Sequence, residues 1–142
     1  MFGAQTAAND RIKSDEEWMD DLLPRNNKFT VLSWVDSDLI ALSAAREKKE
    51  KGFWHVGSDY VKPEFRGGGV GKKMLAFRLE EIIKRGGLKV EAGIDSTNQI
   101  SMGLYESFGF KRANIIDDWQ MMEADLTDSE VIRKVNEVFN AG

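Results

Sequence analysis

Four glycines at five consecutive positions lie between an apolar run of strand-like composition and a longer run with helical spacing: Gly67, Gly68, Gly69 and Gly71. Glycine has no Cβ atom and adopts positive φ angles readily, so successive backbone N–H groups of such a turn can point at one centre. The positive end of the following helix dipole adds to this field. The segment therefore predicts a strand, a turn and a helix that together suit a phosphate.

The side chains around the turn share one sign of charge. Lys62, Arg66, Lys72 and Lys73 contribute four positive charges against Glu64 alone, in a chain whose net charge is −4. A solvated basic surface beside a flexible loop fits the charges equally well, but it does not require four glycines. The glycines, more than the charges, indicate a phosphate site.

Two common nucleotide-binding loops do not fit this turn. A Walker A loop that ends at Gly71 requires glycine at Arg66 and serine or threonine at Lys73. A dinucleotide-binding G-x-G-x-x-G that begins at the first or the third glycine of the turn lacks its last glycine. The spacing excludes both loops.

The pattern that does fit is Arg66-x-x-Gly69-x-Gly71, preceded by Val61-x-Pro63. It resembles the Arg/Gln-x-x-Gly-x-Gly/Ala signature of the GNAT superfamily of N-acetyltransferases, which use acetyl-coenzyme A (acetyl-CoA). In that superfamily the backbone amides of the turn hold the diphosphate of CoA. The resemblance implies that the cofactor is bound by the end of the strand, the turn and the start of the helix: Tyr60, Val61, Arg66, Gly67, Gly68, Gly69, Val70, Gly71 and Lys72.

The hydrophobic pattern of the whole chain predicts alternating strands and helices. Strands are expected at residues 29–35, 39–45, 53–61, 88–94, 110–116 and 119–126, and helices at 14–23, 70–85, 98–108 and 127–140. The last helix begins with a capping box, Thr127-x-x-Glu130. Its apolar stripe either packs on the sheet of this domain or forms a dimer contact.

A strand, a crossover helix and a strand imply that residues 53–61 and 88–94 run parallel, with the glycine turn at the carboxyl end of the first. Ligands favour that end of such a unit. The GNAT resemblance implies an α/β (α+β) fold with a central, mixed, mostly antiparallel twisted sheet, a splayed parallel strand pair and flanking helices.

A chain of 142 residues suits one domain. As a GNAT-like domain it would comprise a helical N-terminal part (1–27), a cofactor-binding core (53–126) and a C-terminal helix (127–140). The superfamily usually begins with a strand, and residues 1–13 show none. The sheet edge is therefore open, covered by the C-terminal helix, or completed by a second copy in a homodimer.

The segment 98–110 resembles the second GNAT motif, Asn-x-x-(Ser/Ala)-x-x-Leu-Tyr-x-x-x-Gly-Phe. At about 100° per residue it has a polar face and an apolar core face: Asn98, Ser101 and Tyr105 against Ile100, Leu104 and Phe108. The resemblance implies that the polar face borders the pantetheine arm of the cofactor and that its tyrosine lies near the thioester sulfur as a candidate acid. Without the resemblance, a tyrosine packed in the core is the commoner explanation.

Acetyl transfer requires a neutral amine, because an ammonium group has no lone pair. His55 is the first candidate base, since its ordinary pKa of about 6.5 leaves it mostly neutral at about pH 7. A polar filling of the sheet surface explains this residue equally well. Asp59, expected on the same strand face and opposite Trp54, Val56 and Tyr60, is the second candidate.

Glycine inside a strand often marks a bulge, and Gly57 lies in the strand 53–61. A bulge would free a backbone N–H between Gly57 and Val61 for the oxyanion of the tetrahedral intermediate. Tyr105 would then protonate the departing thiolate.

Composition excludes several classes of function. The chain has no cysteine and one histidine, so no disulfide, no metal site and no acyl-cysteine intermediate are expected. Its negative net charge argues against nucleic-acid binding. No signal-like or membrane-spanning apolar run is present, so a cytoplasmic protein without membrane contact is expected.

These expectations favour an N-acetyltransferase that moves the acetyl group of acetyl-CoA directly onto a primary amine, of a small molecule or a protein, in a ternary complex. The acidic helix 14–23 and the turn at Asp117 and Asp118 correspond to regions bordering the acceptor in the superfamily, which favours a cationic amine, although acids also keep a surface soluble. The alternatives are a catalytically weak CoA-binding module acting as a sensor or assembly protein, and a nucleotide-binding regulator.

Overall fold

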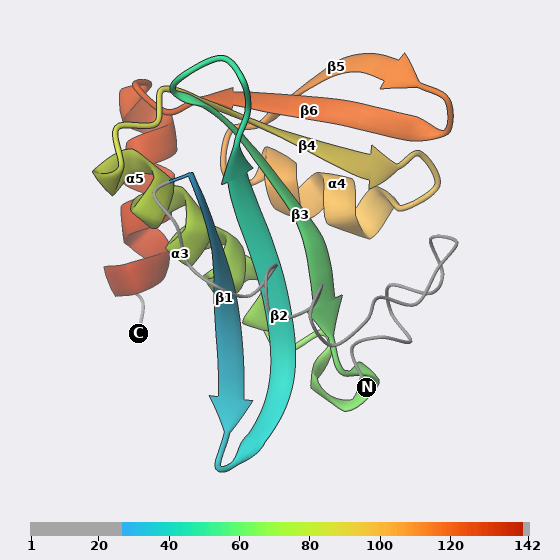
Figure 1. The fold of residues 1–142 in the computed structure, drawn as a ribbon. Helices are drawn as coiled ribbons and strands as arrows, with labels where there is room; N and C mark the ends of the chain where they lie inside the picture. The colour runs from blue at the N-terminus through green and yellow to red at the C-terminus, as the bar shows by residue number, and fades with distance from the viewer. Residues whose placement is uncertain (1–26, 141–142) are drawn as a thin grey trace.

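In the computed structural model, which describes residues 27–140, six strands form one sheet in the order β1-β2-β3-β4-β6-β5 (Figure 1). The strands are β1 (Lys28–Val35), β2 (Asp38–Glu47), β3 (Phe53–Val61), β4 (Lys89–Asp95), β5 (Lys111–Ile116) and β6 (Trp119–Asp125). The β3–β4 pair is parallel and the other neighbours are antiparallel. The predicted fold class and parallel pair are confirmed, whereas the helix expected at 14–23 lies outside the described residues.

Two adjacent rows of side chains, each crossing the sheet from strand to strand, explain its two faces. One row is apolar and buried on five of the six strands, with the exposed Arg112 as its member on β5: Phe29, Ala45, Val56, Ala92 and Met122. The next row is polar on all six strands: Lys28, Arg46, His55, Glu91, Glu123 and Lys111. Because successive side chains of a strand point to opposite faces, the apolar row faces the core and the polar row faces away from it.

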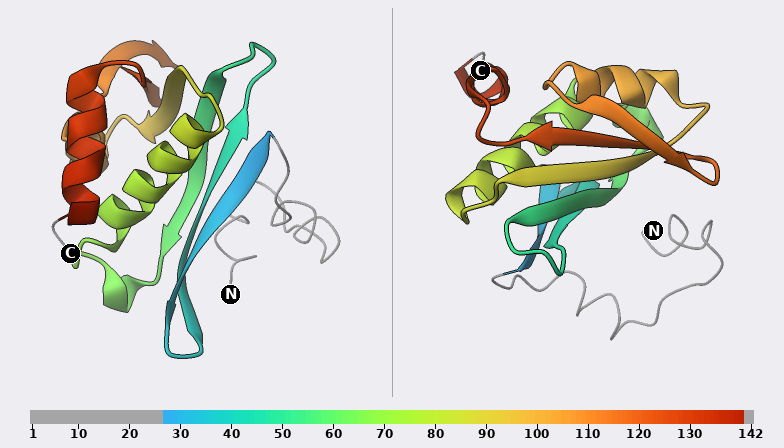
Figure 2. Two further views of the ribbon diagram at one scale, coloured as in Figure 1. Left: turned by 90° about the vertical axis from the view of Figure 1, so that its left-hand side faces the viewer. Right: turned by 90° about the horizontal axis from the view of Figure 1, so that it is seen from above.

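Three helices pack on the apolar face (Figure 2). They are α3 (Val70–Lys84), α4 (Gln99–Glu106) and α5 (Ser129–Asn140), and a short 3-10 turn, η1 (Pro63–Phe65), precedes α3. Their inward side chains form one core with the sheet: Leu75, Leu79, Ile82, Met102, Tyr105, Val131 and Val135. Among residues 27–140, no helix has the length and the apolar composition needed to cross a membrane.

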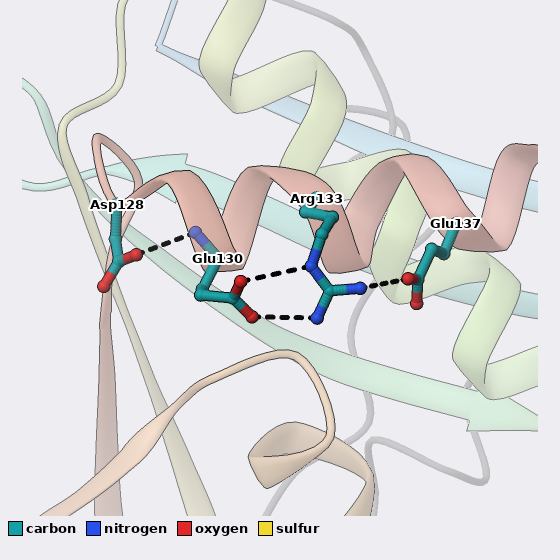
Figure 3. A network of polar contacts seen from close by, with 4 residues as sticks. All are labelled: Asp128, Glu130, Arg133 and Glu137. Carbon is teal, nitrogen blue, oxygen red and sulfur yellow. Dashed lines mark hydrogen bonds and ion pairs between the residues drawn. The ribbon is translucent and has the colours of Figure 1, made fainter.

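The helix α5 packs on this domain's own core beside α3, which was one of the two predicted arrangements. The predicted capping box is wrong, because Asp128 caps the helix by accepting the Glu130 N–H at 2.8 Å. The Thr127 hydroxyl instead donates to Asp125 at 2.6 Å. On the exposed side, Arg133 binds both Glu130 and Glu137 (Figure 3).

The strand β3 contains the bulge that Gly57 indicated. Gly57 pairs with Ala44 and Tyr60 with Leu42, so two residues of β3 lie opposite one residue of β2. The extra residue turns Asp59 toward the helices, where it contacts Arg78 of α3. The predicted alternation, with His55 and Asp59 on one face and Tyr60 on the other, is therefore wrong beyond the bulge.

Gly87, which follows α3, is expected to tolerate no side chain. An alanine Cβ there would lie 2.2 Å from Ile82 Cγ2 and 2.9 Å from the Ile82 carbonyl oxygen. Gly87→Ala should therefore lower the free energy of unfolding by about 1–3 kcal/mol. Urea denaturation measures this change, and a stability equal to that of the wild type would contradict the packing.

The matched control is Gly103→Ala in α4, where an added Cβ meets no atom within 4 Å. Alanine has the higher helix propensity, so this variant should keep the wild-type stability or gain about 0.5–1 kcal/mol.

Candidate active site

The glycine turn presents a set of backbone donors that bind no backbone acceptor of the described residues. The first hydrogen bond of α3 runs from the Lys73 N–H to the Gly69 carbonyl at 3.1 Å. Within residues 27–140, the N–H groups from Gly67 to Lys72 donate to no backbone acceptor. These donors lie at the positive end of the α3 dipole, where an anion is stabilised.

The four glycines of the turn have two different explanations. Gly67 and Gly69 have φ angles of +82° and +85°, which side-chain-bearing residues rarely adopt. Gly68 and Gly71 do not, and an added Cβ would meet its nearest atom at 3.8 Å, an ordinary contact. The fold itself therefore does not require glycine at Gly68 or Gly71, whereas a ligand lying against the backbone would.

The basic side chains of the turn differ in how they are held. Arg66 donates from Nε to the Val61 carbonyl at 2.8 Å and lies over the Tyr60 ring, 5.8 Å from its centroid. Lys62 forms an ion pair of 2.9 Å with Asp38 of β2. Lys72 and Lys73 are exposed. Arg66 and Lys62 thus fix the turn to the sheet.

The parallel strands separate at the height of the turn. Pairing of β3 with β4 ends at Val56 and Ala92, although β3 continues to Val61 and β4 to Asp95 (Figure 1). Beyond this point the facing edges of the two strands are not bonded to each other. We refer to this splayed region beside the turn, where β3 and β4 are not paired with each other, as the opening.

The faces predicted for the second motif are wrong. Ile100 is 90% exposed and Leu104 is half-buried, whereas Tyr105 is 3% exposed and packs edge-on against Phe110 at 5.0 Å. Helical spacing defines which residues share a face but not which face packs inward, and Met102 and Tyr105 take the core side. Of the three residues expected on the core face, only Phe108 is buried as predicted.

Asn98 and Ser101 lie together at the start of α4. The Asn98 side chain accepts the Ser101 N–H at 3.1 Å and so caps the helix. This contact explains asparagine at position 98 by local structure, because it satisfies one of the free amides of a helix N-terminus. Their predicted contact with the cofactor stays a prediction.

Tyr105 is bonded to one of the candidate bases. Its hydroxyl donates to Asp59 Oδ2 at 3.1 Å. Burial, and next the negative charge of Asp59, raise the pKa of Tyr105 well above its ordinary value, although Arg78 acts in the opposite direction. The phenol is therefore held in its protonated form.

Arg78 was not predicted as part of the site. Its side chain is 1% exposed and forms a bidentate ion pair with Asp59, at 2.8 Å from Nη1 to Oδ1 and 3.0 Å from Nη2 to Oδ2. The sequence did offer a signal for its burial. Arg78 lies three residues after Leu75, on the face of α3 that packs into the core, so a charge at this position is buried. Phe77, an apolar residue next to Arg78 in the chain, is by contrast 52% exposed and contacts Phe139 of α5.

His55 lies on the opposite face of the sheet and has a partner that sequence reasoning missed. Its Nδ1 lies 2.7 Å from Glu91 Oε2, and Lys48 Nζ lies 2.7 Å from Glu91 Oε1. The other ring nitrogen, Nε2, lies beside Gly57, where an added Cβ would come within 3.1 Å of it. Nε2 therefore lies close to Gly57, which is the first residue of β3 that no longer pairs with β4. The pairing of His55 with Glu91 depends on the β3–β4 register, which the sequence does not state.

The carboxylate of Glu91 is stabilised in its ionised form. Burial acts to raise its pKa, but the hydrogen bonds from Lys48 and His55 more than offset this effect, so the pKa of Glu91 lies below its ordinary value. An ionised Glu91 is suited to accept a hydrogen bond from Nδ1–H, and in the neutral tautomer that carries its proton on Nδ1 the lone pair lies on Nε2. The two candidate bases therefore differ: the Glu91 contact of His55 is made by Nδ1 and not by Nε2, whereas both carboxylate oxygens of Asp59 contact Arg78.

Of the two acidic segments expected to border the acceptor, only the turn between β5 and β6 lies in the described residues. Asp117 and Asp118 form the exposed turn between β5 and β6, and the acidic helix 14–23 lies outside the described residues. No group of three or more side chains suited to a metal ion is present among residues 27–140.

A mixed sheet with one splayed parallel pair, and a glycine turn and helix start at the end of its first strand, defines an acyltransferase-type fold. The chain matches the Acetyltransferase (GNAT) family over residues 4–110 and belongs to this family. The resemblance read from the two motifs is confirmed.

Individual relatives are more distant. The chain is 41% identical over 61 residues, 42% of its length, to the L-amino acid N-acyltransferase MnaT of Escherichia coli K12, and spans 36% of that protein. PaiA N-acetyltransferase of Thermoplasma acidophilum, solved with coenzyme A, shares 21% identity and a TM-score of 0.64 over 70% of this chain and 61% of that one. An N-acetyltransferase of Staphylococcus aureus Mu50 shares 20% identity and a TM-score of 0.71 over 82% and 79% of the two chains. The solved structures establish the fold.

Glu91→Gln is expected to lower the free energy of unfolding by about 1 kcal/mol near neutral pH. Because the folded-state pKa of Glu91 is lowered, its contribution is present above the pKa of the unfolded chain and is lost as the pH falls through the folded-state pKa. The difference between wild type and variant should shrink toward about pH 3 in urea denaturation.

Glu123→Gln is the matched control, one strand away in the same row. Glu123 pairs with Lys89 at 3.2 Å in a half-exposed position, so its replacement should change stability by less than about 0.5 kcal/mol. A Glu91→Gln difference that is the same at both pH values would contradict the ionised pair.

Proposed function

We propose that this protein is an N-acetyltransferase that transfers the acetyl group of acetyl-CoA directly to a primary amine in a ternary complex. The observation that carries the proposal is the free amides of Gly67 to Lys72 beside the opening between β3 and β4. Membership of the GNAT family and a related structure solved with coenzyme A support this choice of ligand.

In this proposal the diphosphate of CoA lies on the amides of the turn, with Lys72 contributing positive charge. The pantetheine arm enters the opening beyond Val56 and Ala92, bordered by Asn98 and Ser101. Gly68 and Gly71 then have a reason to be glycine, since any side chain there would project toward the ligand. An edge of unpaired strand is also suited to bind an extended amide-bearing arm by main-chain hydrogen bonds.

His55 is proposed as the base in preference to Asp59, because Asp59 is already paired with Arg78. The amine nitrogen attacks the thioester carbonyl carbon, and His55 Nε2 takes the proton that the nitrogen loses. The oxyanion is met by a backbone N–H of the β3 bulge. When the intermediate collapses, the C–S bond breaks and the electron pair leaves with sulfur as thiolate.

Tyr105 is proposed to lie near the departing sulfur as a hydrogen-bond donor. Its hydroxyl donates to Asp59 in this structure, so a bond to sulfur would replace that contact. A thiol with an ordinary pKa of about 8.5 leaves readily as thiolate, so full protonation by this residue is not required for transfer.

The acceptor is proposed to be an amine that approaches from the face of the sheet that carries His55. On that face Glu91 and Glu123 are paired with Lys48 and Lys89. Preference for a cationic amine therefore rests on the exposed Asp117 and Asp118 and stays a proposal. The relative MnaT acts on L-amino acids by its name, so amino acids belong in the panel of test amines together with polyamines, aminoglycosides and peptides.

Gly71→Glu is expected to raise the Kd of CoA by about 10-fold or more, equivalent to ~1.4 kcal/mol. The new carboxylate would face the diphosphate, while the fold should hold, because the site has room for a Cβ and an acid suits the first turn of a helix. Isothermal titration with CoA measures the affinity. Asn136→Glu on the exposed side of α5 adds the same charge elsewhere and should leave the Kd unchanged; equal Kd values for both variants would remove the turn from the cofactor site.

His55→Gln is expected to lower kcat/KM for acetyl transfer by about 100-fold or more near neutral pH, with the Kd of CoA nearly unchanged. Thiol release from acetyl-CoA across the amine panel measures the rate. Lys111→Gln, at the far edge of the same row, is the control and should keep the wild-type rate.

The same assay tests the proposed function as a whole. If CoA stabilises the wild-type protein against heat but no amine accelerates thiol release, the protein is a CoA-binding module and the transferase proposal fails. If neither acetyl-CoA nor CoA stabilises it, both fail.

A further inference from the structure

The guanidinium of Arg78 is buried at the centre of the domain. Its side chain is 1% exposed, and its Nε has no hydrogen-bond partner within the part of the chain that the structure describes. Burying a charge in a protein core is unfavourable unless strong partners compensate. Arg78 therefore needs the bidentate pair with Asp59 to be tolerated in this position.

The contacts of Arg78 meet at the bulge of β3. Besides Asp59 on the bulge, its Nη1 donates to the Ala44 carbonyl at 3.2 Å. Ala44 is the β2 residue at which regular pairing with β3 resumes, opposite Gly57. The Arg78 side chain therefore binds both β2 and β3 at the bulge.

The same carboxylate connects the bulge to α4. Asp59 Oδ2 accepts from Arg78 Nη2 and also from the Tyr105 hydroxyl at 3.1 Å. Tyr105 is in turn fixed by its ring contact with Phe110. Asp59 is therefore the shared partner of α3 and α4 at the point where β3 leaves β4.

We propose that Arg78 is a positioning residue that fixes the β3 bulge and, through Asp59, the hydroxyl of Tyr105. The bulge holds the backbone donor for the oxyanion and the opening for the pantetheine arm, so this role rests on the proposed function. Arg78 itself does not touch the reacting atoms. A planar fork can bind a carboxylate and a carbonyl together, which the single ammonium of lysine cannot reproduce.

The first test is Arg78→Lys, which keeps the charge but loses the fork. It should lower kcat by about 10- to 100-fold, because a small displacement of a reacting group has effects of this size. The Kd of CoA should change less than kcat, because the backbone amides of the turn that hold the diphosphate make no contact with Arg78. Arg112→Lys, at an exposed position, is the control and should keep the wild-type kcat.

Combining Arg78→Lys with Tyr105→Phe tests whether the two residues act as one unit. If they do, the double variant should be no slower than the slower single variant, because residues in one network are not additive. Circular dichroism establishes that each variant is folded. A folded Arg78→Lys variant with the wild-type kcat, or fully additive losses, would overturn the proposal.

A second readout does not depend on activity. Tyr60 and Tyr105 are the two tyrosines of the chain, so in a Tyr60→Phe background the absorbance of ionised phenol reports Tyr105 alone. With Asp59 present, Tyr105 should stay protonated to at least about one pH unit above the ordinary value of about 10. Asp59→Asn should let it ionise at lower pH, because the carboxylate is removed while Arg78 remains. Ionisation at the same pH with and without Asp59 would overturn the network.

The two readouts separate the possible failures. If the wild type transfers acetyl to no amine and the titration shifts as expected, the proposed function fails and the Arg78 network stands. If the wild type is active and either readout gives its contrary result, the positioning role fails and the transferase proposal stands.

Discussion

The extra residue in β3 has consequences on both faces of the sheet. Up to Val56, β3 follows regular pairing with β2 and β4, and its side chains alternate between the core face and the opposite face of the sheet. Beyond that point the bulge turns Asp59 inward and β3 separates from β4. The buried charge of Arg78 stabilises the inward position of Asp59, because an outward position would leave a guanidinium in the core without its carboxylate partner.

Spacing along the chain was sufficient to predict the parts of the site that are local in sequence. The glycine turn, the start of α3 and the presence of a bulge near Gly57 each depend on a few adjacent residues and their backbone preferences. The order of strands and helices followed from hydrophobic periodicity, and the parallel pair from the crossover helix. Bounds differed by a residue or two, as at α4, where Asn98 is the cap rather than a member of the helix.

The parts that could not be predicted depend on contacts between distant segments. Glu91 reaches His55 only through the register of two strands separated by α3. Tyr105 turns inward because its ring packs on Phe110 and its hydroxyl finds Asp59, which helical spacing cannot indicate. Asp59 itself changes face because a bulge moves all later residues of a strand by one step. The errors at Tyr105 and Asp59 are therefore both errors of side-chain orientation.

The polar row on the face opposite the core also constrains how the chain can fold. A slip of one residue in the pairing of a strand would carry Arg46 or Glu91 into the core and bring Ala45 or Ala92 to the surface. A charge buried without a partner is destabilising by several kcal/mol. Because this row crosses all six strands, it disfavours a slip by one residue at every strand pair of the sheet. The face that holds His55 therefore also helps to fix which side of each strand faces the core.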